Sequence, residues 1–279
     1  MDLKFQKLQA ILRATDGLLV AFSGGVDSTF LLKVAHMELG ARAVAVTAAS
    51  PTAAPGELEA AEELAKLIGC QHIIIASHEL DNPAFSTNPV NRCYFCKDEL
   101  YRICAETAAR MDIPVIVDGT NLDDLKDHRP GLKAAKEWGI RHPLVEAELT
   151  KQDIRHYSRE LNLPSWDKPA IACLSSRFPY GLEINAERLA KISACEQFLK
   201  ELRFKQFRVR FHEDLVRIEV ASEEMSRFYD VKTRAAVTSK FKEIGFSFVS
   251  LDLEGYRTGS MNEPLRSRPR QVAGIQDPS

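Results

Sequence analysis

A glycine-rich turn near the start of the chain has the composition of a phosphate-binding loop. An apolar run, LLVAF at 18–22, leads into SGGVDS at 23–28, and an apolar-periodic segment runs from Phe30 to Leu39. This order predicts a buried strand, a tight turn and a helix, although SGG alone also fits an ordinary strand–helix turn with a serine cap. Glycines let a ligand approach the backbone closely, and the N–H groups at a helix N-terminus attract anions. No Lys-Ser/Thr follows at the Walker spacing, so the loop is of another type. The residues expected to bind phosphate here are Ser23, Gly24, Gly25, Asp27 and Ser28.

A second polar turn follows another short apolar run. Residues 113–117 (IPVIV) predict a buried strand, and DGTN at 118–121 comes directly after it, followed by Asp123 and Asp124. Taken alone, this turn fits a solvated loop with a helix cap. Together with the first loop it favours an ATP site, in which one of the two aspartates could help to hold Mg²⁺ and Arg129 could pair with phosphate. The further residues expected to contact ATP are Thr47, Gly119, Asp124 and Arg129.

Three of the six cysteines are placed as metal ligands could be. Cys93 and Cys96 are three residues apart on a predicted helix, 91–111, so their thiolates point the same way. Cys173 lies further along, in AIACLSSR. A structural zinc site, a redox pair and a chance spacing are alternatives. A structural zinc ion usually has four protein ligands, and no fourth ligand is evident nearby in the sequence. Three cysteines with one open position would suit an iron–sulfur cluster. The cysteines expected to be buried structural thiols are Cys70, Cys104 and Cys195.

Arginines in the C-terminal part are expected to bind anions. Arg208 and Arg210 fall on one face of a predicted strand at 207–211, with apolar residues on the other. Arg257 lies in a glycine-flanked loop, and Arg177 follows the cysteine-bearing segment. Any one of these could be an ordinary surface arginine. As a group they suit the phosphate and carboxylates of a nucleotide-like substrate, because guanidinium groups bind oxyanions in a fork. The substrate-binding residues expected are Ser176, Arg177, Arg208, Arg210 and Arg257.

Alternating strands and helices are expected to position the two polar turns. The predicted strands are 18–22, 42–47, 71–76 and 113–117, and the helices between them are 30–39, 57–69 and 91–111. This alternation predicts an α/β fold with a doubly wound parallel sheet. Ligands of such sheets bind at the carboxyl ends of the strands, and both polar turns follow strand ends.

The pattern changes after a proline-bearing segment at 165–169, which is a candidate domain boundary. Beyond it, the predicted elements are a helix at 185–202, strands at 207–211 and 215–220, helical structure at 223–244 and a strand at 246–253. We therefore predict an ATP-binding domain at 1–167, a second, smaller α/β domain at 168–263, and a polar, disordered tail at 264–279.

Length and charge narrow the class of function. The chain has 279 residues and a formal net charge of −2, which argues against broad binding to nucleic acid or a membrane surface. No apolar run approaches the roughly 18–20 residues that span a bilayer, and the N-terminus predicts an amphipathic helix rather than a signal peptide. We expect a cytoplasmic protein whose cysteines are thiols, metal ligands or catalytic groups rather than disulfides.

Five segments, in this order along one chain, resemble the LarE family. They are SGGVDS, NRCYFCKDELY, DGTNLDD, KPAIACLSSR and EGYRTGSMN, and the resemblance covers about residues 15–262. SGGVDS alone is similar to the loop of the wider ATP-pyrophosphatase superfamily. The resemblance implies an ATP-pyrophosphatase domain of the adenine nucleotide alpha hydrolase-like type, followed by a substrate-binding and oligomerisation domain, in a homo-oligomer that can be a hexamer. It also implies an ATP-dependent sulfur transferase that acts on pyridinium-3,5-dicarboxylate mononucleotide in nickel-pincer cofactor synthesis, for lactate racemase-like enzymes.

The resemblance implies a reaction in two stages. ATP adenylates a substrate carboxylate with loss of pyrophosphate, and sulfur then displaces AMP to give a thiocarboxylate. The residues expected to act in catalysis are Asp27, Cys173 and Arg177. One kind of family member has a single cysteine, at the position that Cys173 matches, and gives up its own sulfur. The other kind also has the helical pair, matched here by Cys93 and Cys96, and resembles proteins with a 4Fe–4S cluster that carries extra sulfide. The second kind is predicted, with ATP, Mg²⁺ and a 4Fe–4S cluster as cofactors and sulfide or another sulfur donor as partner.

Three other functions share part of this pattern. An iron–sulfur tRNA thiolase would combine the loop with the cysteines, but the chain has no long basic stripe. An ammonia-dependent ligase such as an NAD or GMP synthetase would not need the three cysteines. A nucleotide sensor would bind ATP without releasing pyrophosphate.

Overall fold

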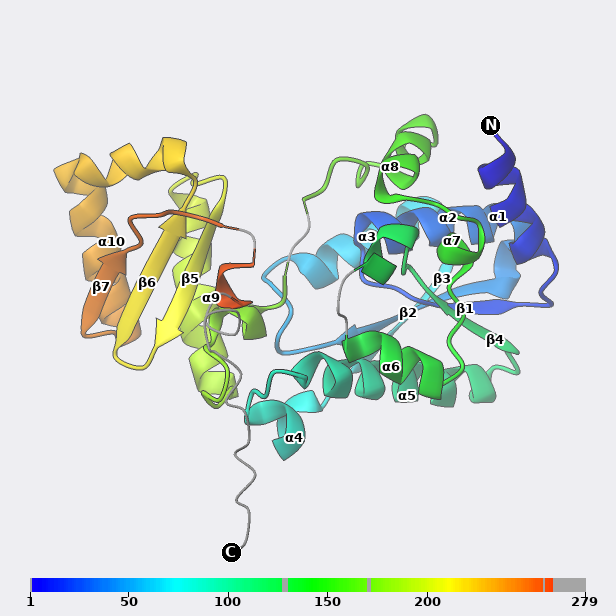
Figure 1. Ribbon diagram of the computed structural model, residues 1–279, viewed down its shortest axis with the longest axis horizontal. Helices are drawn as coiled ribbons and strands as arrows, with labels where there is room; N and C mark the ends of the chain where they lie inside the picture. Colours follow the sequence, from blue (N-terminus) through cyan, green and yellow to red (C-terminus); the bar gives the residue numbers. More distant parts are fainter. Residues whose placement is uncertain (1, 127–129, 170–171, 258, 263–279) are drawn as a thin grey trace, which may run out of the picture. The chain divides into compact units, whose positions relative to one another are not determined.

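The chain folds into two compact units, each with its own sheet (Figure 1). The computed structural model describes residues 2–126, 130–169, 172–257 and 259–262, so Arg129 and the predicted tail at 264–279 lie outside the described residues. The first unit runs to Ser175 and includes Tyr180–Leu189, whereas the second comprises Ser176–Pro179 and the residues from Ala190 onward. In the described part of the chain, no helix has the length and apolar character needed to cross a membrane.

Four parallel strands form the sheet of the first unit, in the order β3-β2-β1-β4. They are β1 (Leu18–Ala21), β2 (Ala43–Ala49), β3 (Gln71–Ala76) and β4 (Val115–Asp118). Every residue of β1 is buried, as expected for a central strand covered on both faces. Ala21 pairs with Val46 on one side and with Asp118 on the other, so the two predicted polar turns leave the sheet from adjacent strand ends. The predicted α/β class with a parallel sheet is confirmed.

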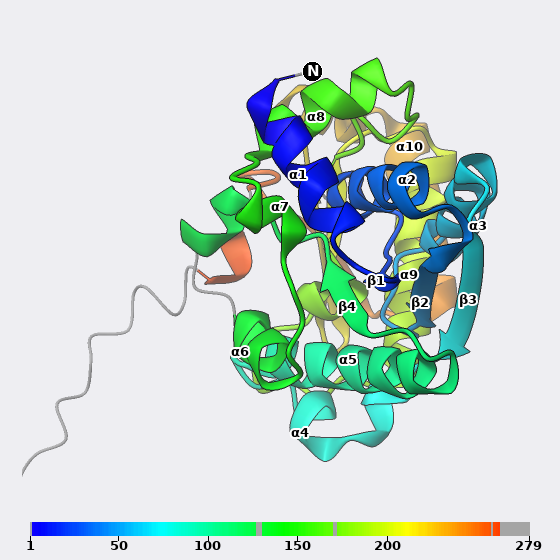
Figure 2. The ribbon, with the colours of Figure 1, turned by 90° about the vertical axis from the view of Figure 1, so that its right-hand side faces the viewer.

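Helices cover both faces of this sheet (Figure 2). The helices on one face are α1 (Leu3–Arg13), α2 (Val26–Leu39), α3 (Glu57–Ile68), α7 (Pro143–Glu146) and α8 (Lys151–Glu160). Those on the other face are α5 (Arg92–Arg110) and α6 (Pro130–Glu137), and the short α4 (Pro83–Ser86) precedes α5. Two apolar clusters result, one around Phe5, Phe30 and Tyr157 and one around Tyr101 and Cys104.

Local signals in the sequence set the ends of several helices. Helix α8 begins with a capping box, in which the Thr150 hydroxyl accepts from the Asp153 N–H while the Asp153 carboxylate accepts from the Thr150 N–H. Helix α3 ends at Gly69, which adopts a left-handed conformation. These caps fix the entry and exit points of helices that flank the polar turns.

The second unit has a three-stranded sheet in the order β5-β6-β7. Strands β5 (Phe207–His212) and β6 (Leu215–Val220) are antiparallel, and β7 (Phe248–Leu251) is parallel to β6. Helix α9 (Ala186–Glu201) precedes the sheet, and α10 (Val231–Ile244) connects β6 to β7. The predicted helical stretch at 223–244 is interrupted: a 3-10 helix, Ser222–Tyr229, ends where Asp230 caps α10. The fold thus has the predicted second, smaller α/β part.

Candidate active site

The SGGVDS loop connects β1 to α2, as the sequence predicts. Gly25 is the N-cap of α2, and the first N–H groups of a helix lack partners within it. Gly24 has a φ of +67°, and a Cβ there would lie 3.0 Å from Ala61, so this position requires glycine. The Ser28 hydroxyl accepts the N–H of Ser23 at 3.3 Å and lies 3.1 Å from the Ser23 hydroxyl. The loop is therefore closed on itself at the start of the helix.

The DGTN turn packs directly against this loop. A Cβ on Gly119 would lie 2.8 Å from the backbone nitrogen of Ser28, closer than a side chain can approach. The Asn121 amide donates to the Asp27 carboxylate at 3.4 Å, and the Asn121 N–H donates to Asp124 at 3.0 Å. The two motifs that the sequence analysis assigns to one site are together in the structure.

A pocket of about 280 Å³ lies where these segments meet. Its lining comes from the loop, the DGTN segment, α5 and α6, and includes Ser23, Gly25, Asp27, Ser28, Lys97, Leu100, Tyr101, Gly119, Asp124 and Gly131. Gly24 and Thr47 do not line it. The Thr47 hydroxyl instead donates to the Phe22 carbonyl at 2.8 Å and lies 2.8 Å from His72 Nε2, so it fixes the backbone that enters the loop.

Two lysines that the sequence analysis does not assign to the site contact the loop. The Lys151 ammonium lies 2.5 Å from Asp27 Oδ2, and the Lys168 ammonium donates to the Gly24 carbonyl at 3.3 Å and pairs with Glu57 at 3.0 Å. In the sequence, Lys151 stands at the start of a helix and Lys168 stands next to a proline in the boundary segment. Both positions are also usual for lysines with only a structural role. The loop therefore has cations beside it that could compensate phosphate charge.

Asp118, the last residue of β4, is a buried and fully hydrogen-bonded carboxylate. It accepts from the Tyr101 hydroxyl at 2.6 Å, from the Thr120 N–H at 3.0 Å and lies 2.7 Å from His142 Nδ1. Burial alone would raise the pKa of Asp118, but the hydrogen bond from His142, the positive charge of Lys97 and the bond from Tyr101 hold that pKa well below its usual range. A fixed negative charge thus lies at one wall of the pocket.

The three predicted metal-ligating cysteines are neighbours in the first unit. Cys93 and Cys173 are exposed and Cys96 is half-buried. Burial raises the pKa of the Cys96 thiol to about 12, and the nearby Cys173, Glu79 and Cys93 add to this effect. The Cys173 segment is anchored to the loop that follows β2, since the Leu174 N–H donates to the Thr52 carbonyl at 2.8 Å.

Three cysteine thiols are the kind of ligand that binds an iron–sulfur cluster. Within the described ranges, no three His, Cys, Asp or Glu side chains are arranged to hold a single metal ion. A four-iron cluster offers separate iron atoms to its ligands, so its thiolates need not converge on one point. Cys104 and Cys195 are buried, as predicted, and Cys70 is half-buried.

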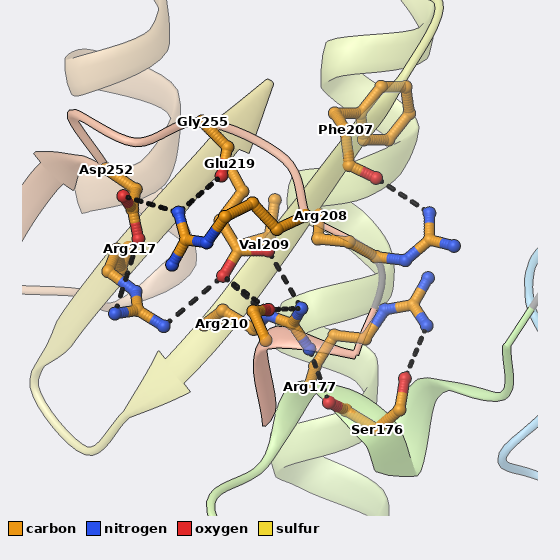
Figure 3. Close-up of polar contacts among 12 residues, drawn as sticks. Ser176, Arg177, Phe207, Arg208, Val209, Arg210, Arg217, Glu219, Asp252 and Gly255 are labelled. Atoms are coloured by element: carbon orange, nitrogen blue, oxygen red, sulfur yellow. Dashed lines mark hydrogen bonds and ion pairs between the residues drawn. The ribbon is translucent and has the colours of Figure 1, made fainter. Parts of the chain in front are cut away.

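The four predicted anion-binding arginines lie in the second unit, but their environments differ. Figure 3 labels Arg177, Arg208 and Arg210. Arg177 is 1% exposed and donates to both oxygens of Glu196, at 2.8 and 2.9 Å. Arg210 does the same to Glu219, at 2.9 and 2.8 Å, and also donates to the Ser176 carbonyl at 2.7 Å. Arg257 pairs with Asp252 at 3.6 Å and with Glu254 at 2.9 Å. Three of the four are thus already matched to carboxylates.

Arg208 differs from these three. It forms no ion pair with a described residue, donates to the Phe207 carbonyl at 2.8 Å and lies 5.1 Å from the centre of the Tyr256 ring. Burial and the neighbouring charge of Arg177 lower the pKa of Arg208 (Figure 3). A half-buried guanidinium beside another guanidinium favours an anion, so Arg208 is the strongest candidate of the four for substrate phosphate.

Comparison with known proteins places these features in one family. No protein-family model matches the chain. An uncharacterised protein of Synechocystis sp. is 44% identical over 95% of this chain and 99% of its own length. The pyridinium-3,5-bisthiocarboxylic acid mononucleotide synthase of Lactiplantibacillus plantarum is 37% identical over 92% of this chain and 93% of its own length. One subunit of the glutamine-hydrolysing GMP synthase of Methanocella arvoryzae is 26% identical over 68% of this chain and 66% of its own length, which points to a wider superfamily. The chain belongs to the LarE family, the family of this bisthiocarboxylic acid mononucleotide synthase.

Proposed function

We propose that the protein is an ATP-dependent sulfur transferase that converts a carboxylate of pyridinium-3,5-dicarboxylate mononucleotide to a thiocarboxylate, in nickel-pincer cofactor synthesis. The observation that carries the proposal is the position of α5. This helix supplies Lys97, Leu100 and Tyr101 to the wall of the phosphate pocket and also bears Cys93 and Cys96. Carboxylate activation and sulfur delivery can therefore share one helix.

Adenylation is assigned to the pocket around the SGGVDS loop. The carboxylate oxygen attacks the α-phosphorus of ATP, and pyrophosphate leaves. The loop and the N–H groups at the start of α2 position the phosphates and stabilise their charge. Asp27 and Asp124 line the pocket with carboxylate oxygens of the kind that Mg²⁺ prefers. They would hold Mg²⁺, whose charge neutralises pyrophosphate when bound.

Sulfur delivery is assigned to Cys93, Cys96 and Cys173. Together they would hold a 4Fe–4S cluster, which when bound supplies an iron with an open position for an added sulfide. The family resemblance matches Cys173 to the sulfur-bearing residue of members with a single cysteine. Cys173→Ala is therefore expected to abolish sulfur transfer whether the sulfur comes from the cluster or from Cys173 itself.

Substrate binding is assigned to the arginines of the second unit. Arg208 would contact the substrate phosphate, and Arg177 and Arg210 would add positive charge beside it while remaining paired to Glu196 and Glu219. Ser176 and Arg257 complete the proposed set. A cytoplasmic location and homo-oligomeric assembly remain predictions of the sequence.

Mass spectrometry of substrate and protein after incubation with ATP, Mg²⁺ and sulfide tests the proposal. We expect AMP, pyrophosphate and a thiocarboxylate product. Intact Cys173 would support delivery from a cluster, and loss of sulfur from Cys173 would support its sacrifice. An amide formed with ammonia would instead identify a ligase, and salt-sensitive binding of bulk tRNA would favour a tRNA thiolase.

A further inference from the structure

Lys97 brings to the nucleotide pocket a positive charge that forms no direct ion pair with a described residue. It lies in the second turn of α5 and lines the same pocket as Ser23, Asp27 and Gly119. Among the described residues it has no ion-pair partner, and its ammonium lies 5.3 Å from the centre of the Tyr101 ring. An ammonium that lines a phosphate pocket and is not paired to a carboxylate is available to an anionic ligand.

Asp118, a carboxylate that lines the same pocket, is already engaged by three neighbouring groups. Its Oδ2 accepts from Tyr101 at 2.6 Å, and its Oδ1 accepts from the Thr120 N–H at 3.0 Å and lies 2.7 Å from His142 Nδ1. The charge of Lys97 helps to keep Asp118 ionised without forming a direct ion pair. Asp118 therefore balances part of the charge of Lys97 and leaves its N–H donors for another oxyanion.

The stem of Lys97 is confined by α6. A Cβ on Gly131 would lie 2.8 Å from Lys97 Cγ and 3.6 Å from Lys97 Cβ, so glycine is what allows the two helices to approach here. A confined side chain loses less conformational entropy when it binds a ligand. Lys97 is therefore held close to the orientation in which it lines the pocket.

We propose that Lys97 is a catalytic residue whose ammonium contacts the α-phosphate of ATP during adenylyl transfer. The inference rests on the proposed function and adds a residue to the same site. Lys97 lies four positions after Cys93, so it shares a side of α5 with that thiol. Because sulfur must reach the activated carboxyl carbon, the reacting α-phosphate has to lie toward this helix rather than away from it.

The step itself is a phosphoryl-type substitution without electron transfer. A bond forms between the substrate carboxylate oxygen and the α-phosphorus. The bond from the α-phosphorus to the bridging oxygen breaks, and pyrophosphate leaves with the electron pair. Negative charge on the non-bridging α-oxygens shifts during this exchange, and a fixed ammonium beside them stabilises the transition state more than the ground state.

Exchange of labelled pyrophosphate into ATP, dependent on pyridinium-3,5-dicarboxylate mononucleotide, tests the role without sulfur transfer. Protein without a cluster suffices for this measurement. Lys97→Met keeps the apolar stem of the side chain, and Lys97→Gln keeps a polar end. If one of these variants does not fold, the other can still be measured. We expect kcat for exchange to fall about 100-fold in either variant, with less than a threefold change in KM for ATP. Lys97→Arg should recover part of the rate.

Lys133→Gln is the matched control. Its ammonium lies 5.2 Å from the centre of the Tyr94 ring, a similar arrangement, but it is paired with Glu137 at 3.8 Å and its side chain is 72% exposed. This variant should exchange at the wild-type rate. If the wild type exchanges pyrophosphate and the Lys97 variants keep its kcat, the inference is wrong while the proposed function stands. The same conclusion follows if the Lys97 variants show only a raised KM for ATP. Absence of exchange in the wild type would overturn the proposed function and this inference with it.

Discussion

The ammonium of Lys151 lies 2.5 Å from a carboxylate oxygen of Asp27, and this ion pair joins the first turn of α2 to the first turn of α8. The backbone N–H of Lys151 also donates to Asp123 at 2.9 Å. Lys151 therefore connects both polar turns of the pocket through contacts that lie far apart in the sequence. Its charge offsets that of Asp27 where ATP would bring several more negative charges.

Removing Lys151 should weaken ATP binding. In Lys151→Met the Asp27 carboxylate would face the phosphates without its cation, and the Kd for ATP should rise about tenfold, or ~1.4 kcal/mol. Isothermal titration calorimetry measures this directly. Lys4→Met is the control, because Lys4 forms a more exposed ion pair with Asp153 of the same helix, at 2.7 Å, without contacting the loop. Equal Kd values for the two variants would place the phosphates away from Lys151.

A methyl group at Gly119 should destabilise the first unit. The added Cβ would lie 2.8 Å from the Ser28 nitrogen, and overpacking of this kind costs about 1–3 kcal/mol. Gly119→Ala should lower Tm by several degrees and weaken ATP binding, as followed by circular dichroism and calorimetry. Gly17→Ala, where the nearest atom would be 3.4 Å away, should leave both unchanged. A Gly119→Ala protein with wild-type Tm would show that the turn can move away from α2.

Neutralising Arg208 should affect substrate binding, whereas neutralising Arg177 should affect the stability of the second unit. Arg208→Gln removes a guanidinium that forms no ion pair with a described residue, so Tm should hold while the Kd for the mononucleotide substrate rises about 10–100-fold. Arg177→Gln leaves Glu196 buried without its cation and should lower the stability of the unit by about 3–5 kcal/mol. Thermal unfolding and substrate titration of both variants separate the two effects. A large loss of Tm in Arg208→Gln would assign it a structural role instead.

The reactivity of Cys96 should depend steeply on pH in metal-free protein. Its pKa is raised to about 12 by burial and by Cys173, so the thiol keeps its proton throughout the neutral range. Alkylation requires the thiolate, so the labelling rate of Cys96 should rise about tenfold for each pH unit between 8 and 10. Peptide mass spectrometry after timed iodoacetamide treatment follows this rate. A rate that levels off below pH 9 would contradict the assignment of Cys96 as a half-buried thiol that keeps its proton at neutral pH.

The sequence predicts the elements of the first unit well because its strands are short apolar runs with glycine or polar residues at their ends. The apolar run at 18–21 and the glycine at 69 each mark an element boundary that the structure has. Helix α6 is not predicted, since it is only Pro130–Glu137 and begins at a proline within a polar stretch. Short helices are stabilised by tertiary packing, here by buried Ala134 and Ala135, rather than by a strong local pattern.

The sequence predicts the site residues that belong to a motif at the end of a strand. It does not predict charged residues that reach the site from distant parts of the chain through tertiary packing. Ser23–Ser28 and Gly119 follow from their positions after apolar runs. Lys151 and Lys97 do not, because only the packing of α8 on α2 and of α5 on the sheet brings them to the pocket. The arginine pattern predicts Arg177, Arg208 and Arg210 as a group, yet the carboxylates that occupy two of them, Glu196 and Glu219, come from other elements.

The hydrogen bond from Thr47 to the Phe22 carbonyl has a consequence for the speed of nucleotide capture. Together with the backbone bond from the Phe22 N–H to Val46, it fixes both polar groups of the residue that leads into the loop. The ordering of this backbone is therefore complete when the chain folds, before any ligand arrives. Nucleotide association should then not have to wait for this entry to the loop to become ordered, which favours capture at a rate set by diffusion and by the charge of the pocket.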